Sequence, residues 1–138
     1  MKPYLILIAL FFTFSISAQD SVKVKAPRVT MQQHLNIPIQ VNSVSIELIK
    51  VLSDSRCPKG VNCIRAGEAK ILVEIIEAGE IIKRKEIVIQ AANHPNNYPL
   101  VFEDRTIKVF AVDLLPYPVY NNKTEDKDYI FKVEKRQI

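Results

Sequence analysis

The chain has 138 residues, of which 48% are hydrophobic and 25% charged, with a formal net charge of +4 at pH 7. This is the composition of an ordinary globular domain and excludes a disordered or low-complexity chain. Basic and acidic residues alternate, and the single basic run, "IIKRKEI", contains no aromatic residue, so nucleic-acid binding is not expected.

The first eighteen residues have the layout of a secretory signal peptide. Lys2 gives a positive start, an apolar run follows, and small residues lead to Ala18. A transmembrane anchor, the competing interpretation, needs about 20 apolar residues, and the run here is shorter. We therefore expect residues 1–18 to be a signal peptide cleaved after Ala18, and residues 19–138 to form a single domain. The exported protein is then periplasmic or secreted, a monomer, and without a stable membrane anchor.

Alternation of apolar and polar residues predicts the first three strands. Residues 21–26, "SVKVKA", and 35–41, "LNIPIQV", each alternate, and Pro38 favours an edge position because it cannot donate to a ladder. Residues 43–51, "SVSIELIKV", also alternate, but the apolar face switches at Ile49, which predicts either a β-bulge or burial on both faces.

Residues 68–90 could form a helix or a hairpin. Their Ala, Glu and Lys residues favour a helix, whereas nine of them are Ile or Val, which favour a strand. With Gly79 and Glu80 as a turn, the segment predicts strands at 69–77 and 81–90.

The rest of the chain predicts two more strands. Residues 93–99, "NHPNNYP", are expected to form a loop, 105–115 a strand that stops at "PYP", and 121–128 an exposed turn. The last strand, 128–136, places Tyr129, Phe131 and Val133 on one face. Seven short strands with turns between them predict an all-β fold, an antiparallel β-sandwich of immunoglobulin-like type.

Both cysteines, Cys57 and Cys63, lie in one stretch and are separated by "PKGVN". In an exported protein such a pair favours a structural disulfide, and Pro58 and Gly60 suit a tight loop. Three alternatives are weaker. A metal site would need further ligands, and a redox dithiol usually has two residues between its cysteines. A catalytic cysteine would need a histidine nearby, and none is local. We expect no metal and no cofactor.

Three basic residues make the loop at 54–67 basic, and two acidic residues flank it. Two interpretations stay open: a solvated rim whose charges pair locally, or a rigid cationic recognition loop. The residues concerned are Asp54, Arg56, Lys59, Arg65 and Glu68.

The stretch "DSRCPKGVNCIRAGEAKI" resembles a signature of small exported bacterial proteins, in which Asp-Ser-Arg-Cys-Pro is followed by Val-x-Cys, an apolar residue, Trp, Ala and Gly. The matching residues are Asp54, Ser55, Arg56, Cys57, Pro58, Val61, Cys63, Ile64, Ala66 and Gly67. Elsewhere the resemblance extends to the strand rhythm and to "LLPYP". It implies an envelope β-domain and no particular activity. The family pattern has Trp where this chain has Arg65, which argues against a sugar stacking at that position.

No hydrolase, metalloprotease, phosphate-loop or calcium-loop motif occurs in the chain. We therefore expect a non-catalytic binding module of the bacterial cell envelope, with no catalytic residues. Its contact surface would be the loop 54–67 together with 93–99, and its partner an envelope protein or a glycan. The alternatives are a secreted hydrolase inhibitor that uses Lys59, and a small enzyme without a recognisable motif.

Overall fold

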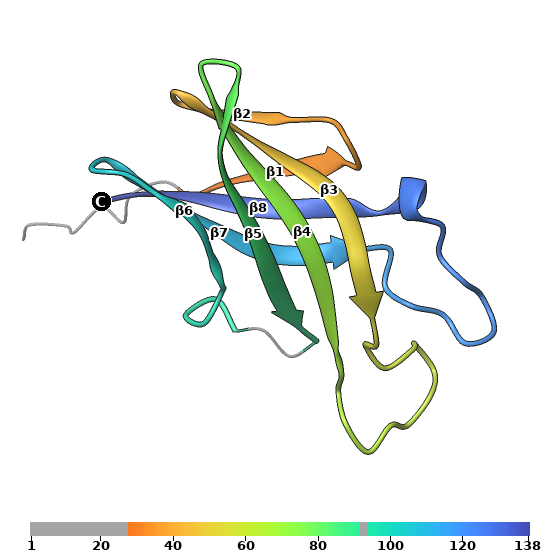
Figure 1. Ribbon diagram of the computed structural model, residues 1–138. Helices are drawn as coiled ribbons and strands as arrows, with labels where there is room; N and C mark the ends of the chain where they lie inside the picture. The colour runs from red at the N-terminus through yellow and green to blue at the C-terminus, as the bar shows by residue number, and fades with distance from the viewer. Residues whose placement is uncertain (1–27, 92–93) are drawn as a thin grey trace, which may run out of the picture.

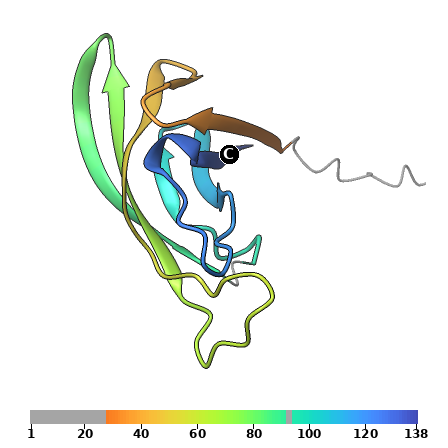
Figure 2. The same cartoon turned by 90° about the vertical axis from the view of Figure 1, so that its right-hand side faces the viewer.

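The computed structural model describes residues 28–91 and 94–138, which form two antiparallel four-stranded sheets packed face to face (Figures 1 and 2). One sheet has the strand order β1 (Val29–His34), β8 (Ile130–Gln137), β7 (Ile107–Leu115), β6 (Leu100–Glu103). The other has the order β2 (Ile39–Val41), β3 (Val44–Asp54), β4 (Glu68–Glu77), β5 (Glu80–Gln90). A short 3-10 helix, η2 (Asp126–Asp128), precedes β8. The prediction of an antiparallel β-sandwich is confirmed.

The chain forms each sheet largely as a meander. Strands β2 to β5 follow one another in the second sheet, β6 to β8 do so in the first, and β1 pairs with β8. This is the order of an up-and-down barrel opened at two places, between β1 and β2 and between β5 and β6. Immunoglobulin sandwiches have Greek-key connections, so the likeness to them lies in the two packed layers.

The core lies between the sheets and consists of the inward side chains of both. β-branched residues dominate it, as expected on a pleated surface. Burying each large apolar side chain contributes about 1.5–3 kcal/mol relative to leaving it exposed. The largest fully buried side chains include Ile46, Leu48, Ile71, Ile75, Ile87, Ile89, Ile107, Leu114 and Phe131.

The hairpin prediction for 68–90 is confirmed. β4 and β5 pair along their whole length, and Glu77 lies opposite Glu80. Ala78 and Gly79 form the turn with positive φ values of 51° and 85°, which two-residue hairpin loops favour. The turn therefore lies one residue earlier than predicted.

Two finer predictions for the second sheet are also confirmed. The β3–β4 register shifts between Leu48 and Lys50, and again between Val51 and Ser53, so the apolar face changes sides as expected. β2 is an edge strand, and Pro38 comes directly before it.

The strand predicted at 35–41 is too long, since only Ile39–Val41 is extended. Asn36 has a φ of 57° and donates its N–H to the carbonyl of Leu48, so the chain turns there. Ile37 is consequently exposed rather than inward-facing. Residues 21–26 and the signal peptide predicted at 1–18 lie outside the described residues.

Strands β1 and β6 were not predicted, and the described residues therefore form eight strands rather than seven. In β1 the one buried residue is Gln33, and Met31 on the same face packs against the core. With its amide oriented to satisfy its neighbours, the nitrogen donates to the carbonyls of Ile37 and Ile46, and the oxygen accepts from the N–H of Leu48. A polar residue thus occupies a position where alternation predicts an apolar one. Across the described ranges, no helix is long and apolar enough to cross a membrane.

Candidate functional site

The disulfide between Cys57 and Cys63 is present, with the two Cα atoms 5.9 Å apart, and the prediction is confirmed. It closes a ring of residues 57–63 in the outer part of the loop between β3 and β4, and we call residues 58–65 the tip. Below the tip, Ser55 donates its N–H to the carbonyl of Glu68, and Cys57 donates to Ala66, both at 2.9 Å. These bonds continue the β3–β4 ladder into the loop, so residues 54–57 and 66–68 form an ordered base.

Gly67 is required in this base for two reasons. Its φ is 71°, in the left-handed region that side chains disfavour. A Cβ atom there would lie 1.9 Å from the carbonyl oxygen of Ser55, because the two sides of the loop approach closely at this point. Gly60, in the tip, also has positive φ, but a Cβ there would meet nothing within 4 Å.

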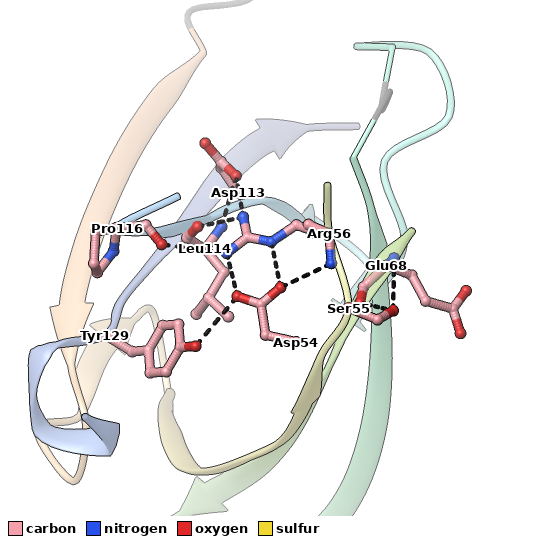
Figure 3. Close-up of polar contacts among 8 residues, drawn as sticks. All are labelled: Asp54, Ser55, Arg56, Glu68, Asp113, Leu114, Pro116 and Tyr129. Carbon is pink, nitrogen blue, oxygen red and sulfur yellow. Dashed lines mark hydrogen bonds and ion pairs between the residues drawn. The ribbon is translucent and has the colours of Figure 1, made fainter. Parts of the chain in front are cut away.

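Arg56 lies in the interior of the base and is only 2% exposed. Its guanidinium forms a bidentate ion pair with the carboxylate of Asp54. Nε donates to Oδ1 at 2.9 Å, and Nη2 donates to Oδ2 at 2.7 Å (Figure 3). Nη1 donates to the carbonyl of Leu114 at 2.6 Å, at the end of β7. One arginine therefore ties the loop to both sheets of the sandwich.

Further contacts complete the environment of Arg56. Its guanidinium lies 3.4 Å from Asp113, donates to the carbonyl of Pro116 at 3.3 Å, and lies 4.7 Å from the centre of the Tyr117 ring. Burial alone would lower the pKa of Arg56, but its hydrogen bond and charge attraction to Asp54, with a contribution from Asp113, raise that pKa. Arg56 is therefore a fixed cation.

Tyr129, at the start of the last strand, completes this network. Its hydroxyl donates to Oδ2 of Asp54 at 3.2 Å (Figure 3). Burial and the neighbouring charge of Asp54 raise the pKa of Tyr129. Both carboxylate oxygens of Asp54 thus accept hydrogen bonds, which leaves this carboxylate poorly suited to act as a general base. A cavity of about 340 Å³ adjoins the pair and is lined by residues 51–54, Pro118, residues 122–124, Asp126 and Tyr129.

The structure divides the five residues predicted for a binding loop into two groups. Asp54 and Arg56 belong to the interior of the base, where the Arg56 guanidinium is buried and paired with Asp54. Lys59 and Arg65 lie exposed in the tip, and Glu68 is half-buried and pairs with Lys70 at 3.4 Å. The charge pattern alone could not separate the two groups, since three basic residues occur within ten positions.

The tip packs against residues 116–122. Lys59 donates its N–H to the carbonyl of Pro118 at 3.0 Å and forms an isolated parallel bridge with Val119. In the 93–99 segment, by contrast, the carbonyl of Pro95 accepts a hydrogen bond from Arg136. The two parts of the sequence that carry the family resemblance, "DSRCP" and "LLPYP", therefore meet in space.

Four apolar side chains are exposed on these two neighbouring segments. Ile64 is fully exposed, Tyr120 is 64%, Val119 50% and Val61 37% exposed. We call residues 58–65 and 116–122 together the end surface. Sequence reasoning missed the contribution of 116–122, although "PYPVY" signals it: an aromatic and a β-branched residue beyond the end of a strand have no core to enter.

Among residues 28–91 and 94–138, no group of three His, Cys, Asp or Glu side chains is placed to hold a metal ion. Comparison with known proteins found no matching family model, no matching curated protein and no matching solved structure. The two packed meanders and the braced disulfide loop are therefore the basis for a functional assignment.

Proposed function

We propose that this protein is an exported, non-catalytic binding module of the bacterial cell envelope, and that the end surface is its recognition site. One observation carries the proposal. Ile64, Val119 and Tyr120 are exposed on two segments that are joined to each other and braced from below. Exposed apolar side chains gathered on one surface mark interaction sites.

The bracing supports binding because it fixes the shape of the surface in advance. The disulfide closes the tip, the ladder bonds hold its base, and Arg56 links that base to Leu114 and Pro116 beside the second segment. A surface that is already ordered loses less conformational entropy when a partner binds.

The disulfide also supports an extracytoplasmic location, because such bonds persist in oxidising compartments. The signal-peptide pattern at 1–18 agrees with export, and the family resemblance suggests a bacterial envelope.

The alternative of a hydrolase inhibitor has less support. An inhibitory loop would need to present Lys59 to a protease cleft on a free segment of chain. Here the backbone N–H of Lys59 is bonded to Pro118, and its ammonium group lies 6.0 Å from the centre of the Tyr117 ring. The tip is therefore not a free segment of chain, because it is joined to residues 116–122 as part of the end surface.

Capture of envelope components tests the proposal. The immobilised protein is compared with two double variants: Ile64→Ser with Tyr120→Ser on the end surface, and Val29→Ser with Ile138→Ser as a matched control. The control residues are also exposed, at the opposite end of the sandwich (Figure 1). We expect the end-surface variant to lose its captured components while the control retains them. Equal capture by all three proteins would refute the assignment.

A further inference from the structure

We propose that the end surface docks onto the anionic surface of a lipid bilayer, with Ile64, Tyr120 and Val119 entering the headgroup region. This rests on the proposed function and names the partner of the same surface. Three features of the described residues carry it: the direction of the apolar side chains, the balance of charge, and the shape of this end of the molecule.

The apolar side chains project outward instead of lining a hollow. One cavity, beside Asp54 and Tyr129, is lined in part by Pro118 and Asn122, and another is lined by Ser55, Gln90 and residues 65–68. Neither is lined by any of the four exposed apolar residues of the end surface. Hot spots between proteins commonly fill well-packed pockets, whereas an interfacial segment needs only apolar groups that can enter a fluid boundary.

The end surface itself carries charge of one sign. Residues 58–65 and 116–122 contain Lys59 and Arg65 and no aspartate or glutamate, which gives a net charge of +2. Three of the flanking acidic groups pair with neighbouring cations: Asp54 with Arg56, Glu68 with Lys70, and Glu125 with Lys127. Asp126 and Asp128 follow in η2. Cations beside apolar groups are the combination that anionic headgroups attract.

The shape of the molecule suits a flat partner. The loop that carries the tip projects beyond the ends of β3 and β4, and 116–122 lies beside it (Figures 1 and 2). The tip can therefore reach a plane before either sheet does. Tyr120 adds an amphipathic ring of the kind that is enriched at membrane interfaces.

Vesicle sedimentation tests the inference. The purified protein is mixed with vesicles of phosphatidylcholine alone, or with about 30% phosphatidylglycerol to supply negative charge. We expect sedimentation with the anionic vesicles only. Ile64→Ser with Tyr120→Ser should lower the partition coefficient at least about tenfold, because two buried apolar groups are lost. Lys59→Gln with Arg65→Gln should lower it about 30-fold at low salt, and less at high salt.

Matched controls separate these effects from general ones. Val29→Ser with Ile138→Ser removes exposed apolar groups at the opposite end, and Lys50→Gln with Arg105→Gln removes the same amount of charge from other exposed positions. Both controls should sediment like the unmodified protein, and all variants should keep its melting temperature.

The outcomes distinguish this inference from the proposed function. If the protein does not sediment with anionic vesicles, yet envelope capture still requires Ile64 and Tyr120, the partner is a protein or a glycan and lipid docking is refuted. If neither vesicles nor envelope components depend on these residues, both proposals fail. A loss that is as large in the controls would also refute docking through the end surface.

Discussion

The base and the tip of the disulfide loop belong to one short stretch of sequence but have opposite environments. Arg56 is sealed inside the base, held by Asp54 and by the carbonyl of Leu114. Arg65, nine positions later, lies exposed in the tip. The same residue type is thus a structural cation in one place and a surface charge in the other. What decides between the two roles is whether a carboxylate and carbonyl groups are present to receive the guanidinium.

The base therefore supports the loop, and the tip exposes its side chains to solvent. The polar groups of the base bind one another, so the geometry of the base should depend strongly on each of these residues. The tip makes few internal contacts beyond the disulfide and the bond to Pro118, so its side chains should be replaceable without loss of the fold.

The largest effect is expected from removing the buried cation. Arg56→Met should destabilise the protein by about 3–5 kcal/mol, because it leaves the Asp54 carboxylate buried without its partner. Arg65→Met should change the stability by no more than about 0.5 kcal/mol, as is usual for exposed sites. Urea denaturation of both variants measures the two values. Similar midpoints would show that the base and the tip do not differ in this way.

A pair of glycine substitutions tests the close approach of the two sides of the loop. Gly67→Ala should cost more than the roughly 1–2 kcal/mol of left-handed strain, because its Cβ would overlap the carbonyl of Ser55. Gly60→Ala should cost only that strain, since nothing lies nearby. Thermal melting of both variants provides the comparison, and equal losses would contradict the tight contact at Gly67.

Removing the disulfide should have an intermediate effect. Cys57→Ser with Cys63→Ser should fold and lose about 2–2.5 kcal/mol, the entropic contribution of closing so small a loop. The ladder bond from Ser55 to Glu68 lies outside the closed ring and should keep the base in place. Calorimetry measures the loss, and a thiol assay of the unmodified protein should detect no free cysteine. An unchanged melting temperature would show that the disulfide does not stabilise the fold.

The smallest paired effect is expected at two tyrosines. Tyr129→Phe should cost about 1 kcal/mol, because it removes the hydroxyl that donates to Asp54. Tyr120→Phe should cost almost nothing, since Tyr120 is exposed. The pKa of Tyr129 is raised, so its contribution is present below about pH 10 and is lost as the pH rises through the folded-state pKa. Denaturation at neutral and alkaline pH checks both statements.

Much of the fold was predictable because its strands alternate clearly. The last strand, with Phe131 and Val133 inward, and the 68–90 hairpin depend on local patterns that the structure retains. β1 could not be predicted because its buried position holds Gln33, whose amide is satisfied by backbone groups of another sheet. β6 is only four residues long, too short to show a period.

The candidate site was predictable in part. The disulfide followed from two cysteines in a tight loop of a chain expected to be exported, and the structure confirms it. The burial of Arg56 depends on Leu114 and Pro116, almost sixty positions away, and no local pattern indicates such a contact. The end surface has the same long-range origin, since it exists only because the tip meets Val119.

Hydrogen exchange in the presence of isolated cell envelope tests the central claim most directly, because it locates the contact without any substitution. We predict slower exchange at amides of residues 59–65 and 119–123 when envelope is added, with no change in β1 or β6. Protection that appeared on the sheet strands instead, or no protection at all, would contradict the assignment of the end surface as the recognition site.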